Sequence, residues 1–309
     1  MLGAIAGDIV GSIYEFNNIR KKDFILFSPD CFFTDDTVMT IAVFKALIHS
    51  KRKNFANLTQ KTIKFMQKYG KIYPNLSYGN SFRHWLKQKN PKGYDSYGNG
   101  SAMRVSAVAY FSKNLEEVKN LSRKVTEVSH NHVEGLKGAE ATAVAIWLAL
   151  NGKNKEEIKA YITKNYYSLD FDYEDLKKNY RFNETCQETV PQAIYCFLIS
   201  EDFEDCLRTS VSIGGDTDTL CAISCAIAEA YYDIPDKIQE AILRFLDKRL
   251  KKDVKRMLKM KKEHTKQYGV LKKTLLDENG KEYEEEIRLD NIKTKSDEKS
   301  LRKLLKNKH

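Results

Sequence analysis

The chain has 309 residues, 42% of them hydrophobic, which is enough for a sizeable core in one large domain or two ordinary ones. Its formal net charge is +10, but the charge is unevenly distributed. Residues 248–309 hold 21 Lys and Arg against 11 Asp and Glu, whereas residues 1–247 hold 31 of each. The balanced body carries no sequence-wide sign of nucleic-acid binding, so we expect a body at 1–247 and a separate basic extension at 248–309.

The cysteines and the apolar stretches indicate a reduced, cytoplasmic protein. Six cysteines show no Cys-x-x-Cys or zinc spacing, and Cys221 and Cys225 lie one helical turn apart in an apolar run, as small buried side chains do. Asp8 and Glu15 interrupt the apolar start, so no secretory signal is predicted. No apolar run is long and clean enough to span a membrane, and a monomer is the default expectation.

Residues 1–16 combine a stripe of small residues with two acidic side chains. The glycines are spaced four residues apart, which lets another helix approach closely, at Gly3, Gly7 and Gly11. In a continuous helix Asp8 and Glu15 would lie two turns apart on one face. Acidic residues on such an apolar helix indicate a site, although solvated charge remains the simpler interpretation for Asp8.

Two segments place acidic residues and threonines directly before an apolar helix. They are Thr34-Asp35-Asp36-Thr37 and Gly214-Gly215-Asp216-Thr217-Asp218-Thr219. One polar residue suffices to cap a helix, and adjacent carboxylates repel unless a cation lies between them. Oxygen-only clusters suit hard cations such as Mg²⁺. Either segment alone is equally compatible with an elaborate helix cap, but the repetition favours a cation site.

The loop at residues 92–101 is rich in glycine and polar residues and precedes a helix start predicted at 102–109. Its last residues, Asn99, Gly100 and Ser101, offer backbone N–H groups beside glycine, an arrangement that can hold an anion. The loop matches neither a P-loop nor a dinucleotide fingerprint, and a simple turn would look similar. It is a weakly specific candidate for a phosphate site.

The rest of the body is predicted to be helical, because no window before residue 269 shows convincing strand alternation. Helices are expected at 58–69, 78–87, 115–129, 133–150, 154–165, 172–179, 183–199 and 203–212, with one or two more over 235–268. The fold class is therefore all-α, as a compact single domain. In the extension, 269–277 and 282–289 could form a hairpin around Asn279-Gly280, and 293–309 has the composition of a solvated charged tail.

Five blocks occur in a fixed order: Gly7-Asp8-x-x-Gly11-Ser12-x-Tyr14-Glu15, Thr34-Asp35-Asp36-Thr37, Tyr97-Gly98-Asn99-Gly100-Ser101-Ala102-Met103-Arg104, Ser129-His130 and Gly214-Gly215-Asp216-Thr217-Asp218-Thr219. Together they closely resemble the ADP-ribosylglycohydrolase family, which includes the dinitrogenase reductase-activating glycohydrolase and the ADP-ribosyl-acceptor hydrolases. The resemblance covers roughly residues 1–245, and the complete set of blocks is highly specific. The tail matches no known pattern.

The resemblance implies an all-α hydrolase with two Mg²⁺ ions, or Mn²⁺ in some members, that removes ADP-ribose from a modified acceptor. By motif position the metals would be held by Thr34, Asp35 and Asp36 from one side and by Asp216, Asp218 and Thr219 from the other. Asn99, Gly100 and Ser101 match the loop that holds the diphosphate and the distal ribose. His130 matches a histidine that contacts the substrate.

Glu15 matches a glutamate that activates water or gates the substrate in one branch of the family. In the nitrogen-fixation branch a different aspartate acts as the base, and this chain has no secure counterpart for it. Asp95 lies nearby in sequence but belongs to the glycine-rich loop. Glu15 is therefore the candidate catalytic residue, and the identity of the base stays open.

The leading interpretation is a Mg²⁺-dependent hydrolase acting on an ADP-ribosylated protein, with nucleic acid or a small molecule as other acceptors. A non-catalytic ADP-ribose-binding relative is an alternative, although such relatives are expected to lose metal ligands. A nucleic-acid-associated protein that acts through its basic tail is a third interpretation. The sequence does not identify the acceptor group.

Overall fold

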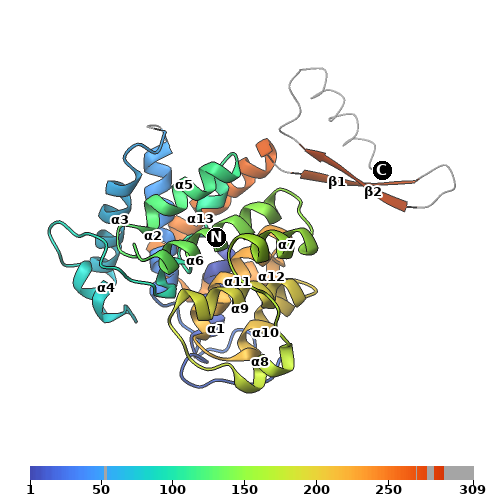
Figure 1. Ribbon diagram of the computed structural model, residues 1–309, viewed down its shortest axis with the longest axis horizontal. Coiled ribbons are helices and arrows are strands. Elements are labelled where there is room, and N and C mark those ends of the chain that lie inside the picture. Colours follow the sequence, from blue (N-terminus) through green and yellow to red (C-terminus); the bar gives the residue numbers. More distant parts are fainter. Residues whose placement is uncertain (52–53, 269, 277–281, 289–309) are drawn as a thin grey trace.

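The computed structural model describes residues 1–51, 54–268, 270–276 and 282–288 (Figure 1). The described body consists of helices, which confirms the all-α prediction. The α-helices are α1 Leu2–Gly11, α2 Asp35–Ser50, α3 Leu58–Ile72, α4 Asn80–Trp85, α5 Leu115–Thr126, α6 Val133–Leu150, α7 Lys155–Asn165, α8 Tyr173–Asn179, α9 Cys186–Ile199, α10 Phe203–Ile213, α11 Thr217–Tyr231, α12 Asp236–Phe245 and α13 Lys248–Tyr268. None of the helices in this part of the chain is long and apolar enough to cross a membrane.

Helix α11 lies at the centre of the fold and packs against α1, α6, α9 and α10 (Figure 1). Its contact with α1 depends on the glycine stripe. A Cβ atom added to Gly7 would lie 2.6 Å from the backbone nitrogen of Ala222, and one added to Gly11 would lie 2.6 Å from the Cα atom of Asp218. Only glycine permits this backbone-to-backbone approach, and the close packing brings the end of α1 next to the acidic start of α11.

Helix α1 is shorter than the sequence pattern indicated, because it ends at Gly11 and Ser12 forms its C-cap. The Ser12 hydroxyl donates to the carbonyl of Ile9 and accepts from the backbone N–H of Phe32. Glu15 therefore lies in the following turn and not on the same helical face as Asp8.

Residues 102–109 do not form the α-helix that was predicted from the sequence. Two short 3₁₀ helices, η2 Asn99–Ser101 and η3 Val108–Phe111, occupy this region. The Thr40 hydroxyl donates to the Met103 carbonyl at 3.3 Å, and that carbonyl would otherwise accept a helical bond. The segment is thus held to α2 by a tertiary contact.

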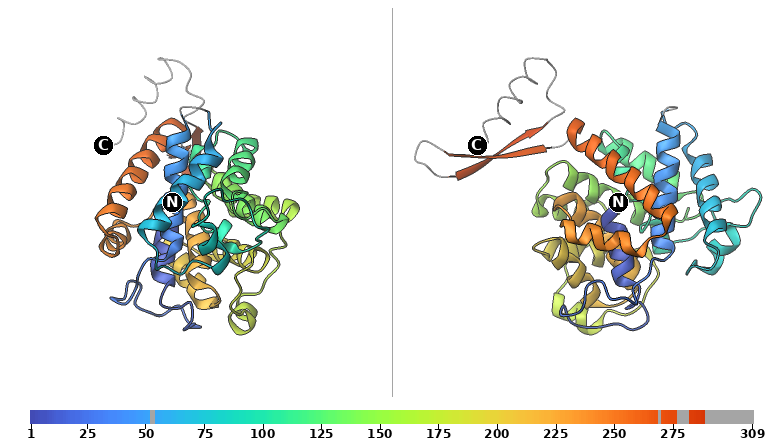
Figure 2. Two further views of the ribbon diagram at one scale, coloured as in Figure 1. Left: turned by 90° about the vertical axis from the view of Figure 1, so that its left-hand side faces the viewer. Right: turned by 180° about the vertical axis from the view of Figure 1, so that it is seen from behind.

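The chain beyond residue 247 begins with α13, which packs against α2 (Figure 2). Leu250, Val254 and Met257 are buried, and Asp253 pairs with Lys45 at 2.7 Å. The boundary at residue 247 stays a prediction, but the first part of the proposed extension contributes to the core. Residues 235–268 form two helices, α12 and α13.

Two antiparallel strands follow α13. Strand β1, Val270–Leu276, pairs with β2, Glu282–Arg288, in a register that places Val270 opposite Arg288. The hairpin expected near 269–290 is therefore present. The predicted Asn-Gly turn and the charged tail at 293–309 lie outside the described residues.

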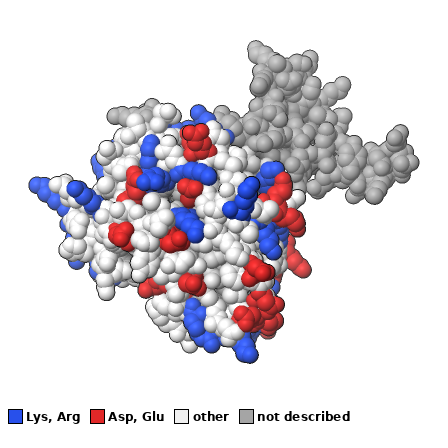
Figure 3. Space-filling model, viewed as in Figure 1, with Lys and Arg blue, Asp and Glu red and all other residues white. Residues whose placement is uncertain are grey.

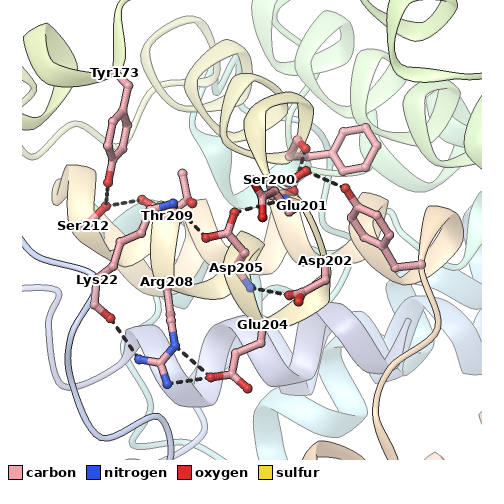
Figure 4. A network of polar contacts seen from close by, with 12 residues as sticks. Lys22, Tyr173, Ser200, Glu201, Asp202, Glu204, Asp205, Arg208, Thr209 and Ser212 are labelled. Carbon is pink, nitrogen blue, oxygen red and sulfur yellow. Dashed lines mark hydrogen bonds and ion pairs between the residues drawn. The ribbon is translucent and has the colours of Figure 1, made fainter.

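A network of polar contacts fixes the loop after α1 on the start of α10 (Figure 4). The Arg208 guanidinium donates to the carbonyls of Lys22 and Phe24, both at 2.9 Å, and pairs with Glu204 at 2.6 Å. The ammonium group of Lys22 pairs with Asp205 at 2.8 Å. This long loop is thus held at defined points on α10.

Candidate active site

A cavity of about 670 Å³ opens beside the N-terminal ends of α2 and α11. This volume lies in the range of small-ligand sites. Most of the residues selected from the sequence line it: Glu15, Asp35, Asp36, Asn99, Gly100, His130, Asp216, Asp218 and Thr219. Thr34 and Ser101 are not among its lining residues.

Three carboxylates from two separate segments meet at the centre of the cavity. Glu15, Asp216 and Asp218 each place one oxygen within 4.8 Å of the others. Asp36 approaches the same region, because its Oδ2 atom accepts from the Thr219 hydroxyl at 3.4 Å. The two acidic helix starts therefore face each other.

The turn before α11 depends on two glycines with left-handed backbone angles, φ +71° at Gly214 and +82° at Gly215. Side chains are also excluded there by crowding. A Cβ atom on Gly214 would lie 2.6 Å from the Arg20 guanidinium, and one on Gly215 would overlap with the ring of Tyr180. This turn fixes Asp216 at the N-cap position of α11.

Asp8 positions the acidic start of α2 from the neighbouring helix. Its buried carboxylate accepts from the backbone N–H groups of Thr34 and Thr37 at 3.0 Å each and from the Thr34 hydroxyl at 2.7 Å. Asp8 thus caps α2 together with the Thr34 hydroxyl, which accepts from the Asp36 N–H at 3.2 Å. The side chains of Asp35 and Asp36 are therefore not needed to cap α2.

Asn18 connects the Glu15 turn to the Gly215 turn. Its side-chain nitrogen donates to the carbonyls of Tyr14, Glu15 and Gly215 at 2.6, 3.1 and 3.0 Å, and its side-chain oxygen accepts from the Gly215 N–H at 2.8 Å. The sequence analysis missed this residue, because a single asparagine in a long loop carries no distinctive signal.

The crowded carboxylates strongly favour their protonated forms when no cation is present. Burial, reinforced by the charge of Asp218, raises the pKa of Asp8 and of Asp35 to about 7. The same two causes raise the pKa of Glu15 to about 8. They also raise the pKa values of Asp36 and Asp216 well above the usual range of a carboxyl group.

The cluster has the chemistry of a divalent-cation site. The Oδ1 atom of Asp36 is buried and has no hydrogen-bond partner among the described residues, and the same holds for the Thr37 hydroxyl. Buried carboxylate oxygens normally have a partner. A hard cation would bind the unpartnered Asp36 oxygen and reduce the repulsion between the carboxylates. The donor set therefore fits Mg²⁺ or a similar ion.

The glycine-rich loop closes the cavity beside the acidic cluster. The Asn99 amide donates to Asp216 at 2.7 Å and to the Thr189 hydroxyl at 3.1 Å, which ties the loop to α11 and α9. Ser101 lies beneath the loop. Its hydroxyl donates to the carbonyls of Gly98 at 3.1 Å and Gly135 at 2.9 Å, so it supports the loop from the interior.

His130 lies under the same loop with its Nε2 atom toward Gly100, since a Cβ atom there would be 3.4 Å away from it. Its Nδ1 atom is 2.8 Å from the Ser129 hydroxyl and 3.3 Å from the buried Arg104 guanidinium. Burial and the Arg104 charge hold the pKa of His130 well below its usual range. The imidazole is therefore neutral.

Asp95, the other candidate for the base, lines the cavity but is not part of the cluster of Glu15, Asp216 and Asp218. It has a left-handed backbone, with φ +58°, and its N–H donates to the Asn131 side chain at 2.7 Å. The geometry therefore favours Glu15 over Asp95 for chemistry at the acidic cluster.

The chain is similar to known proteins over most of its length. ADP-ribosylhydrolase ARH3 from Mus musculus is 27% identical, with 78% of this chain and 85% of that protein covered. ADP-ribosylarginine hydrolase Tri1 from Pseudomonas putida strain GB-1 is 24% identical, with 76% of this chain and 70% of that protein covered.

A solved structure of an ADP-ribosylglycohydrolase-related protein complex shares the fold, with a TM-score of 0.62 at 21% identity. The match covers 84% of this chain and 95% of that one. A family model described as ADP-ribosylglycohydrolase matches residues 1–267. The chain therefore belongs to the ADP-ribosylglycohydrolase family.

Proposed function

We propose that the protein is a metal-dependent hydrolase that removes ADP-ribose from an ADP-ribosylated acceptor, in the first place a protein side chain. The observation that carries the proposal is the meeting of Glu15, Asp216 and Asp218 in one cavity, opposite the acidic start of α2. Membership of the family supports the breaking of a glycosidic bond to ADP-ribose.

Two Mg²⁺ ions, or Mn²⁺, would be held by Thr34, Asp35 and Asp36 from α2 and by Asp216, Asp218 and Thr219 from α11. When bound, the ions would neutralise the carboxylates and polarise the water and the ribose hydroxyls. Thr34 would take this role through its hydroxyl oxygen, which already contacts Asp8 at 2.7 Å and Asp36 at 3.5 Å.

Glu15 is the proposed proton acceptor. It is the only member of its three-carboxylate cluster that is partly exposed, so a water molecule can reach it beside the substrate. The water oxygen would attack the anomeric carbon while Glu15 takes its proton, and the bond to the acceptor would break with its electron pair leaving to the acceptor atom. The anionic surroundings would stabilise an oxocarbenium-like transition state.

The rest of the ADP-ribose would lie along the glycine-rich loop. Gly98 and Gly100 line the cavity and leave room for a diphosphate to approach the backbone. His130 is neutral and faces this loop, so it would act as a hydrogen-bonding partner and not as a charge.

The test is the release of ADP-ribose by Asp36→Asn and Asp216→Asn variants in the presence of Mg²⁺ or Mn²⁺. Both are expected to lose activity by at least about 100-fold while they stay folded, since even the partners that only orient metal ligands cost 10- to 100-fold. Glu240→Gln, an exposed acid-to-amide change on α12, is the matched control and should keep full activity.

The same experiment separates the alternatives. A non-catalytic relative would bind ADP-ribose but release none from any substrate. Full activity in a folded, metal-stripped Asp216→Asn protein would disprove the metal-dependent mechanism.

A further inference from the structure

A second hollow, of about 460 Å³, is lined by Arg20, Glu174, Lys177, Lys178 and Arg181. Its one carboxylate is already neutralised, because Lys177 lies 3.1 Å from both oxygens of Glu174. Three positive charges therefore remain. This concentration contrasts with the body as a whole, whose charges balance. Charges of both signs are interspersed over the face drawn in Figure 3.

Two of these cations are held in place side by side. Arg20 donates to the carbonyls of Ile213 and Tyr180, and Arg181 donates to the same Tyr180 carbonyl at 2.9 Å and to that of Lys178 at 2.7 Å. Burial, and secondly the charge of Arg181, lowers the pKa of Arg20. Fixed like charges repel each other, and an anion between them would remove that repulsion.

The hollow adjoins the mouth of the active-site cavity. Arg181 is followed directly by Phe182, which lines that cavity and stacks on Phe16 with the ring centroids 5.6 Å apart. Phe16 in turn follows Glu15. A group leaving the anomeric carbon beside Glu15 would therefore emerge at the two phenylalanine rings, a few residues from the cations.

We propose that the hollow binds acidic residues that flank the modified side chain of the acceptor protein. This inference rests on the proposed function and specifies its substrate class as ADP-ribosylated proteins with Asp or Glu near the modification. Carboxylates would pair with Lys178 and Arg181, and the backbone of the acceptor would pass over the exposed rings.

An acidic polypeptide fits this surface better than a nucleic acid does. Nucleic-acid binding requires a track of cations that follows the phosphates. Here no such track continues from the hollow, because Phe16 and Phe182 are 83% and 42% exposed and Glu184 is exposed as well. Exposed aromatic rings beside a charged group are typical of protein interfaces.

The experiment compares two ADP-ribosylated peptides with the same acceptor residue, one flanked by Asp and Glu and one by Ser and Gln. The wild-type protein is expected to show a KM about tenfold lower for the acidic peptide with an unchanged kcat, and the preference should weaken in high salt. ADP-ribose linked to a free amino acid serves as the substrate without flanks.

A Lys178→Glu/Arg181→Glu variant should lose the preference while it hydrolyses the substrate without flanks normally. Lys178→Glu alone, at an exposed position, is a milder second variant and should lose part of the preference for the acidic peptide. The matched control is Lys159→Glu/Lys164→Glu, which makes the same charge change at exposed positions on α7. It should leave the preference intact.

The outcomes separate the two proposals. Equal KM values for both peptides, or a preference that survives Lys178→Glu/Arg181→Glu, would overturn the acidic-flank inference and leave the hydrolase standing. If no substrate is cleaved, the hydrolase proposal fails, and fluorescence-anisotropy titration of the two peptides decides the inference by binding alone. Stronger competition by a single-stranded oligonucleotide than by the acidic peptide would also overturn it.

Discussion

Asp8 shows how one buried side chain can prepare a site without lining it. Its carboxylate accepts two backbone N–H groups and a hydroxyl from the start of α2, across a helix interface. The local N-cap residue, Thr34, accepts the Asp36 N–H. Because Asp8 and Thr34 cap the helix, the carboxylates of Asp35 and Asp36 are not needed as caps, and both residues line the cavity.

We predict that Asp8→Ala destabilises the metal-bound protein by about 2–4 kcal/mol, since buried donors left without a partner cost about 1–3 kcal/mol each. Asp8→Asn keeps one acceptor oxygen and should cost clearly less. Urea denaturation in the presence of Mg²⁺ measures both. An Asp8→Ala protein as stable as the wild type would show that Asp8 does not cap α2.

Several features of the site could be predicted from single residues, and others could not. The repeated acidic helix starts mark Asp36 and Asp216 as candidate cation ligands, and both residues line the same cavity. Nothing in the sequence distinguished Asn18 from other loop asparagines, because its importance comes from a turn 197 residues away. Ser101 belongs to a recognisable block, but only the fold reveals that its hydroxyl faces the interior.

At the scale of elements, the glycine stripe of α1 determines how closely α1 and α11 pack, and so how close the acidic segments come. We predict that Gly7→Ala destabilises the protein by at least about 3 kcal/mol, because the new Cβ atom would meet the backbone of α11 and overpacking against backbone cannot relax. Thermal or urea denaturation measures the loss.

Gly79→Ala is the matched control for that change. No atom lies within 4 Å of a Cβ placed on Gly79, and its φ of −55° is accessible to alanine. The free energy of unfolding of the Gly79→Ala variant should stay within about 1 kcal/mol of that of the wild type. If both variants are equally stable, the packing of α1 on α11 tolerates a methyl group and the explanation of the stripe is wrong.

Helices were predictable from the sequence where local pattern and tertiary packing agree, as in α6 and α7. Helices were not predictable from the sequence where a group distant along the chain contacts the segment. The Thr40 hydroxyl donates to the Met103 carbonyl within 102–109, and α1 ends at Gly11, four residues before Glu15. Both exceptions border the active site, where the chain must present side chains that a regular helix would direct elsewhere.

At the scale of the whole molecule, the distribution of charge along the sequence differs from its distribution in the folded protein. The net positive charge of the sequence is concentrated after residue 247, in the C-terminal extension. The basic hollow nevertheless lies in the electrically balanced body, because folding brings Arg20 beside residues 174–181. Such a patch, made from two distant segments, has no counterpart in a linear count of charges.

The acidic cluster also predicts how the stability of the whole protein depends on pH and metal. Folding raises the pKa of Glu15 to about 8 and that of Asp35 to about 7, whereas a carboxyl group in the unfolded chain titrates near pH 4. Between these values the folded state holds more protons than the unfolded state. The free energy of unfolding of the metal-free protein should therefore fall as the pH rises from about 4 to 8.

Melting curves in EDTA and in Mg²⁺, at pH 5 and pH 8, test this. We expect EDTA to lower the Tm at pH 8 by at least about 3 °C more than at pH 5, because bound cations neutralise the ionised carboxylates. The size follows because about 1 kcal/mol corresponds to 2–4 °C in a domain of 150–250 residues. Asp36→Asn removes one charge from the cluster, so at pH 8 the metal-free variant should melt above the metal-free wild type and gain less from Mg²⁺. A metal-free wild type that is no less stable at pH 8 than at pH 5 would contradict the role assigned to these carboxylates, because Glu15, Asp35, Asp36, Asp216 and Asp218 cannot all ionise at no cost without a cation.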